Sequence, residues 1–131
     1  MEEALRSYLL AGADLSALVA TRIHWVRSPQ GAASPRIVLY RISGLRDMHM
    51  QGPSGLVASR VQVDCIGASY GSAKAVARAV ETRLSGYSGT YDGLRFEGCF
   101  LIGERDDFED TNTPDKLFRT SLDFNIWHKG A

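Results

Sequence analysis

The chain has 131 residues, fifteen basic against fifteen acidic side chains, and a hydrophobic content of 44%. This length and composition predict one folded domain over residues 1–131 with a packed core, and they exclude a disordered chain. The balanced charge argues against a free-standing nucleic-acid binder and against binding to an anionic membrane surface.

The N-terminal segment and the cysteines indicate where the protein is made. The chain opens with two glutamates instead of a basic region, and Arg6 and Asp14 interrupt the apolar residues that follow, so we expect neither a signal peptide nor a membrane span. Cys65 and Cys99 each lie in a strand-like run, which favours buried thiols in a reducing compartment. We therefore expect synthesis in the cytoplasm.

The first half of the chain predicts two helices, two strands and a loop. Apolar residues recur at helical spacing over residues 2–11, and Asp14 is a good N-cap for a second short helix. Strands are expected at residues 22–25 and 36–43, the second being rich in β-branched and aromatic residues. Residues 44–55, GLRDMHMQGPSG, are too long and polar for a tight hairpin turn, and Met48 and Met50 suggest a loop that serves as a contact arm.

The second half predicts three strands and one helix. Residues 56–66 alternate between apolar and polar side chains, as in a strand buried on one face only. Residues 70–84 carry an apolar stripe at helical spacing, and strands are expected at residues 94–102 and 117–128. The expected order is α-α-β-β-β-α-β-β. This order predicts an α+β single domain with a mixed, mostly antiparallel sheet, helices packed on one face and one crossover.

The segment Gly67-Ala68-Ser69-Tyr70-Gly71 matches the Gly-x-Ser-x-Gly pattern of a nucleophile elbow between a strand and a helix. A small serine hydrolase using Ser69 is therefore one alternative. It is disfavoured because the available acid and imidazole, Asp123 and His128, have opposite parity in the last strand and so point to opposite faces. The preferred interpretation is that Gly67 ends the strand and Ser69 caps the helix through an amide near Ser72.

The sequence predicts no cofactor and no metal site. The same glycine segment lacks the spacing of a phosphate loop, the three histidines are isolated, and neither cysteine has a partner at ligand spacing. The run ERDDFEDTNTPDK, residues 104–116, lacks the turn glycine and terminal glutamate of a calcium loop, and we expect it to be a solvated charged loop.

Four quoted segments, LSALVATRIHW, PRIVLYRISGLRD, GPSGLVASRVQVDCIGASYGSAKAVARAVETRLSG and LFRTSLDFNIWH, resemble the tail completion family of long-tailed bacteriophages. The most specific pieces are RVQVDC leading into the helix and LDFNIWH at the end. One departure is Ile66-Gly67 after Asp64-Cys65, where an aromatic residue is expected. Related proteins occur in prophages and gene transfer agents.

The resemblance implies a non-enzymatic structural protein of the virion, synthesised and assembled in the bacterial host cytoplasm. It implies a ring of six subunits that caps the tail tube protein and offers a docking surface to head connector or stopper proteins. Double-stranded DNA would pass through this ring without specific binding, and no membrane partner is expected. A head completion protein or another neck ring of the same particle is the alternative.

A closed ring needs two different patches on each subunit, and the sequence offers two candidates. The expected subunit interface consists of the arm and the polar face of the sheet: Arg46, Asp47, Met48, His49 and Met50, with Arg60, Gln62, Asp64, Arg119, Asp123 and Asn125. Water alone could equally satisfy the polar face. The acidic loop is expected at the lumen or the head-facing rim, through Glu104, Asp106, Asp107, Glu109 and Asp110.

Overall fold

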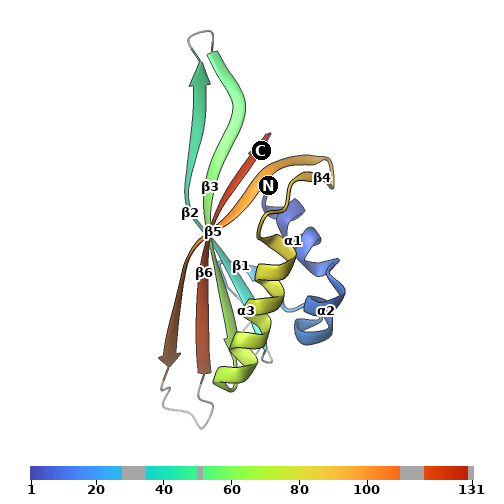
Figure 1. Ribbon diagram of the computed structural model, residues 1–131, viewed down its shortest axis with the longest axis vertical. Helices are drawn as coiled ribbons and strands as arrows, with labels where there is room; N and C mark the ends of the chain where they lie inside the picture. The colour runs from blue at the N-terminus through green and yellow to red at the C-terminus, as the bar shows by residue number, and fades with distance from the viewer. Residues whose placement is uncertain (28–34, 50–51, 110–116, 130–131) are drawn as a thin grey trace.

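The computed structural model describes the backbone of residues 1–27, 35–49, 52–109 and 117–129, and the side chains of these residues except 43–49, 52–56 and 109. The described part contains three helices and one six-stranded sheet (Figure 1). In chain order the elements are α1 Glu2–Leu10, α2 Ala13–Val19, β1 Ile23–Trp25, β2 Arg36–His49, β3 Gly52–Gly67, α3 Tyr70–Leu84, β4 Gly89–Tyr91, β5 Leu94–Glu109 and β6 Leu117–Lys129.

The strand order is β1-β2-β3-β6-β5-β4, so the last strand of the chain lies in the middle of the sheet. β1 and β2 are parallel and every other neighbouring pair is antiparallel. The predicted α+β class with a mixed, mostly antiparallel sheet is confirmed. The crossover through α3 connects β3 to β5, which run in the same direction with β6 between them. The short strand β4 and the parallel β1–β2 pair were not predicted.

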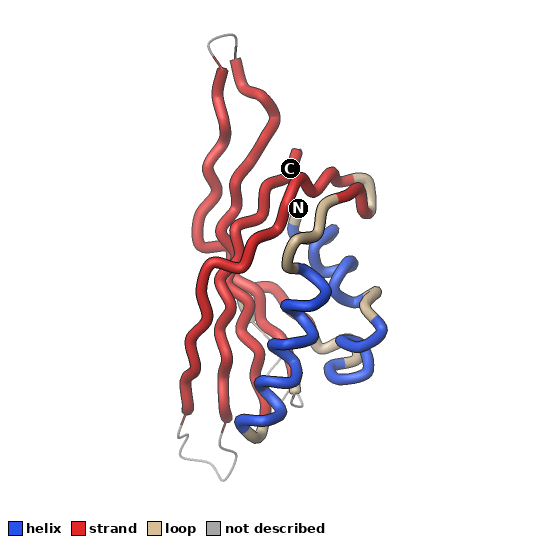
Figure 2. Tube along the Cα trace, viewed as in Figure 1, coloured by secondary structure: helices blue, strands red, loops and turns tan. Residues whose placement is uncertain are grey.

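All three helices cover one face of the middle of the sheet (Figure 2). Alternation along β3 and β6 supplies the core on this face, where Val63 lies opposite Leu122 and Val61 opposite Phe124. All four side chains are fully buried, and removal of their apolar surface from water stabilises the fold.

Helix α3 has the bounds that its apolar stripe predicts. Its five core side chains, Ala73, Val76, Ala77, Val80 and Leu84, are completely buried. Ser69 is its N-cap, and the Ser69 hydroxyl accepts a hydrogen bond of 3.1 Å from the backbone N–H of Ser72, as predicted.

Helices α1 and α2 pack beside α3. The Arg83 guanidinium lies 3.9 Å from the centre of the Tyr8 ring and donates two hydrogen bonds to the Tyr8 carbonyl, while the Tyr8 hydroxyl donates to the Arg83 carbonyl. The N-cap of α2 is Gly12, so the prediction that Asp14 caps this helix was wrong and Asp14 lies inside its first turn. None of the described helices is long and apolar enough to cross a membrane.

β2 and β3 extend beyond the helices at one end of the sheet, whereas β5 and β6 run to the opposite end beside the start of α3, as Figures 1 and 2 show. Beyond the Arg46–Val57 pair, β2 and β3 continue as a two-stranded ribbon in which Met48 pairs with Pro53 and His49 with Gly52. β5 and β6 continue at the other end, where Glu109 pairs with Leu117. The predicted loop at residues 44–55 is therefore strand, and the predicted loop at residues 104–116 is strand over 104–109; residues 50–51 and 110–116 lie outside the described residues.

Candidate assembly surfaces

The arm consists of residues 43–49 of β2 and 52–56 of β3. Four predicted interface residues, Arg46, Asp47, Met48 and His49, lie in its β2 strand, and Met50 lies outside the described residues. Within the described chain, Gly52 and Pro53 of β3 pair with β2 alone, since the β3–β6 ladder ends at Leu56. Beyond the Arg46–Val57 pair the arm is therefore a ribbon of two strands without the support of the sheet, whereas residues 43–46 lie opposite residues 57–60 of β3, which also pair with β6.

The polar face of the sheet comprises Arg60, Gln62, Asp64, Arg119, Asp123 and Asn125 on the side away from the helices. Asp64 accepts hydrogen bonds from the Gln62 amide at 2.8 Å and the Ser121 hydroxyl at 2.7 Å. The Asp123 carboxylate lies 3.1 Å from a guanidinium nitrogen of Arg105 and 3.5 Å from one of Arg60.

These contacts change the interpretation of the polar face. Asp64 is only 2% exposed and Asp123 8%, so the prediction that β3 is buried on one face only was wrong at Asp64. Arg105 also donates to Gln62, at 2.9 Å, and so joins the two carboxylates through one network. The Asp123 carboxylate is paired with arginines of the same subunit, and the Asp64 carboxylate is satisfied by the Gln62 amide and the Ser121 hydroxyl.

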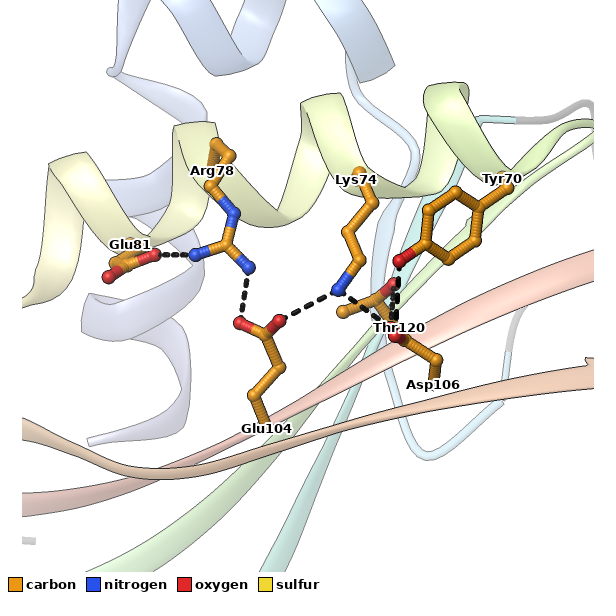
Figure 3. A network of polar contacts seen from close by, with 7 residues as sticks. All are labelled: Tyr70, Lys74, Arg78, Glu81, Glu104, Asp106 and Thr120. Carbon is orange, nitrogen blue, oxygen red and sulfur yellow. Dashed lines mark hydrogen bonds and ion pairs between the residues drawn. The ribbon is translucent and has the colours of Figure 1, made fainter.

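The predicted acidic loop is strand β5 over Glu104–Glu109, and part of it is clamped to α3 (Figure 3). The Lys74 ammonium lies 2.7 Å from the Glu104 carboxylate and 2.8 Å from that of Asp106. Arg78 also pairs with Glu104 and with Glu81. We call this set of contacts the α3–β5 clamp.

Ion pairing and hydrogen bonds set the protonation of the clamp. The hydrogen bonds from Lys74 and Arg78 hold the pKa of Glu104 below its usual value, and those from Lys74 and then Thr120 do the same for the pKa of Asp106. The same contacts, led by the one to Asp106, raise the pKa of Lys74. These groups stay charged at neutral pH, and their charges largely cancel.

Three acidic residues of the predicted loop, Asp107, Glu109 and Asp110, lie outside the α3–β5 clamp. The Asp107 carboxylate lies 2.7 Å from the Arg119 guanidinium, which lowers the Asp107 pKa. Glu109 ends β5 without a described side chain, and Asp110 lies outside the described residues.

The structure does not bring the elements of a serine hydrolase together. The Ser69 hydroxyl accepts from the Ser72 amide, whereas the His128 ring lies 2.9 Å from the Ser59 hydroxyl, with both Ser59 and His128 buried. Asp123 is engaged with arginines on the other face, as the opposite parity of Asp123 and His128 predicts.

Four exposed apolar side chains on β2 and β5 were not predicted from the sequence. Ile42 is 54% exposed on β2, and Phe100, Ile102 and Phe108 are 53%, 46% and 45% exposed on β5. The Phe100 ring lies over Gly98, where an added Cβ would come within 2.8 Å of it. Apolar residues in a predicted strand are expected to be buried, so the sequence alone gave no reason to expect these side chains to be exposed.

Comparisons with known proteins identify the family. The sequence matches the family described as tail completion protein gp17 over residues 3–129. The fold is similar to that of a chain in the virion of a native gene transfer agent particle, with a TM-score of 0.75, 23% sequence identity, and coverage of 99% of this chain and 95% of that one. No match was found among curated proteins. Because the family match covers nearly the whole chain, this protein belongs to the tail completion protein gp17 family and is a structural protein of phage or phage-like tails.

Proposed function

We propose that six copies of this protein form a ring that caps the tail tube and provides the surface on which the head connector or stopper proteins dock. The protein acts in this proposal through assembly and shape, without a catalytic step. Family membership supports the place in the tail. The observation that carries the ring is the arm, which extends beyond the helix-covered body (Figure 1).

The arm has the properties of a contact element. A two-stranded ribbon alone is marginally stable in water, and its outer edges carry backbone groups ready to pair with another chain. A closed ring uses heterologous contacts, in which one patch of a subunit meets a different patch of the next. Contact with a neighbouring subunit would supply the partner that the arm lacks within its own chain.

The polar face remains the proposed second contact of the ring. Because Arg60, Arg105 and Asp123 already pair within one subunit, this face would contribute register and shape more than new ion pairs. A substitution of Arg60 alone should therefore weaken assembly less than loss of the arm.

The acidic end of β5 is proposed to lie at the lumen or at the rim that faces the head. A strongly basic lumen would bind the DNA backbone through counterion release and slow its passage. Here the acids of residues 104–107 are balanced by Lys74, Arg78 and Arg119, so this surface would be close to neutral. Such a surface neither holds nor repels DNA strongly.

The decisive experiment shortens the arm. Replacing residues 47–56 by Asn-Gly joins Arg46 to Val57, which lie opposite each other, through a loop that favours a tight hairpin turn. The change leaves the core intact, so the variant should unfold at nearly the temperature of the unmodified protein. We expect it to lose binding to isolated tail tubes, measured by co-sedimentation and electron microscopy.

Two outcomes decide between the proposal and its alternatives. A shortened variant that caps tubes as well as the unmodified protein would refute the role of the arm. Binding of the unmodified protein to empty heads and not to tubes would instead assign it to the head side of the neck, as a head completion or other neck-ring protein.

A further inference from the structure

We infer that neighbouring copies join edge to edge, so that the outer edge of β5 in one subunit pairs with the outer edge of β2 in the next. This inference rests on the proposed ring and specifies its contact. The β2 edge denotes residues 41–49, and the β5 edge denotes residues 100–109. The partner is a second copy of this chain, and the bonds that join the copies are backbone hydrogen bonds between strands.

Both edges are open in the described part of the chain. β1 covers β2 only at Ile37–Leu39, and no other described strand pairs with β2 on that side. β4 covers β5 only at Leu94–Phe96, and the Cys99 carbonyl accepts one further bond, of 2.8 Å, from the Gly86 amide. Each open edge is therefore about as long as the other.

Each edge displays an isoleucine at a β-bulge. In β2 the extra residue is Ile42, between the pairs Arg41–Val61 and Ser43–Arg60. In β5 it is Ile102, between the pairs Leu101–Phe124 and Gly103–Asp123. Bulges commonly protect an edge by twisting it away or by presenting a charge, but here each one presents a large apolar side chain to solvent.

The exposed apolar residues concentrate at these edges. Four of the seven exposed large hydrophobic side chains of the described chain, Ile42, Phe100, Ile102 and Phe108, lie on the two edges. A single exposed apolar residue is ordinary, whereas a group of them along an unpaired strand marks an interaction site. Edge pairing would cover Ile42 and Ile102 together with the unpaired backbone. Phe100 and Phe108 lie on opposite faces of β5, and the Phe108 ring already lies 4.8 Å from that of Phe118.

The charges of the two edges differ in sign. Residues 104–109 of the β5 edge contain four acids and one arginine, and residues 41–49 of the β2 edge contain two arginines and one aspartate. The α3–β5 clamp neutralises Glu104 and Asp106, but the Asp107 side chain stays 56% exposed beside Arg119. The remaining difference favours pairing of unlike edges over pairing of two β5 edges.

The directions of β2 and β5, and the positions of their open edges, are compatible with a closed ring of subunits. β2 is antiparallel to β3, β3 to β6 and β6 to β5, so β2 and β5 run in opposite directions in one subunit. A rotation about an axis along the sheet therefore brings them together as an antiparallel pair. The two open edges extend toward opposite ends of the sheet (Figure 1), so pairing staggers neighbouring subunits, as a closed sheet of tilted strands requires.

The experiment uses one substitution on each edge. Ile42→Lys places a charge on the β2 edge and Ile102→Lys on the β5 edge, and both side chains are about half exposed, so the fold should tolerate them. Each variant alone should be a monomer by sedimentation velocity at about 100 μM. An equimolar mixture should give a dimer of about twice 14.4 kDa, because one variant keeps an intact β5 edge and the other an intact β2 edge.

The controls separate this inference from the proposed function. Val26→Lys changes an exposed apolar residue that follows β1 and lies outside both edges, and it should leave association unchanged. Ile42→Thr and Ile102→Thr replace the lysine variants if circular dichroism shows unfolding. A mixture that stays monomeric, or single variants that still form rings, would overturn edge pairing even if the unmodified protein caps tubes. Dimers in the mixture without tube capping would support edge pairing and refute the proposed function.

Discussion

The junction between β3 and α3 gives a sharp test because two glycines four residues apart have opposite roles. At Gly67 an added Cβ would lie 2.7 Å from the backbone nitrogen of Ala73 and 2.8 Å from the hydroxyl of Ser72. At Gly71, in the first turn of α3, nothing lies within 4 Å of the added atom. Gly67→Ala should therefore destabilise the protein, and Gly71→Ala should stabilise it.

The magnitudes follow from these distances. Ordinary contact for a Cβ begins at 3.4 Å, so Gly67→Ala must move the start of α3 by roughly half an ångström or more against a packed sheet. Such overpacking costs about 1–3 kcal/mol, whereas alanine for glycine in an open helical position gains about 0.5–1 kcal/mol. Urea unfolding of the two variants measures both, with an expected difference of at least about 1.5 kcal/mol. Equal effects of the two substitutions would show that α3 does not pack on Gly67 as described.

Three further predictions concern the cap, the clamp and the thiols. Ser69→Ala should lower the free energy of unfolding by about 1 kcal/mol, and leave tube binding intact, because only a helix cap is lost; urea unfolding and tube co-sedimentation check this. Lys74→Met should cost at most about 1 kcal/mol at pH 7, since the ion pairs are partly exposed. The partner carboxylates, Glu104 and Asp106, have lowered pKa values in the folded state, so the clamp contribution is complete above their ordinary pKa values of about 4 and is lost as the pH falls through the lowered values. The unfolding free energies of the two proteins should therefore converge at acid pH. Burial raises the pKa of both thiols, that of Cys99 to about 12, so a thiol reagent should modify neither cysteine before unfolding; rapid labelling of the native protein would contradict the packing.

Local patterns account for what the sequence could predict. The bounds of α3, the cap at Ser69 and the inward residues of β3 and β6 depend on spacing within a few residues, and all of them are confirmed. The opposite faces of Asp123 and His128 follow from the same periodicity. The family resemblance is confirmed as well, because it rests on the order of several such segments along the chain.

What the sequence could not predict depends on contacts between distant residues. The run from Glu104 reads as a loop because charged residues seldom form strands, yet Lys74, Arg78 and Arg119 neutralise its acids across 12 to 30 positions. The arm was predicted as a loop for a related reason, since its polar residues hide a strand ladder that two register shifts interrupt. The three residues of β4 are too few to show a period.

The β-bulges at Ile42 and Ile102 explain why the exposure of these two side chains could not be predicted from strand alternation. An extra residue at Ile42 or Ile102 shifts the alternation of its strand by one position, so a strict period of two would place that residue or its neighbours on the wrong face. Both isoleucines look like core in the sequence and are exposed in the structure. The monomer gains nothing from exposing them. Both lie on strand edges that no other described strand covers, which is why the proposed edge pairing assigns association to the edges and not to the helix-covered body.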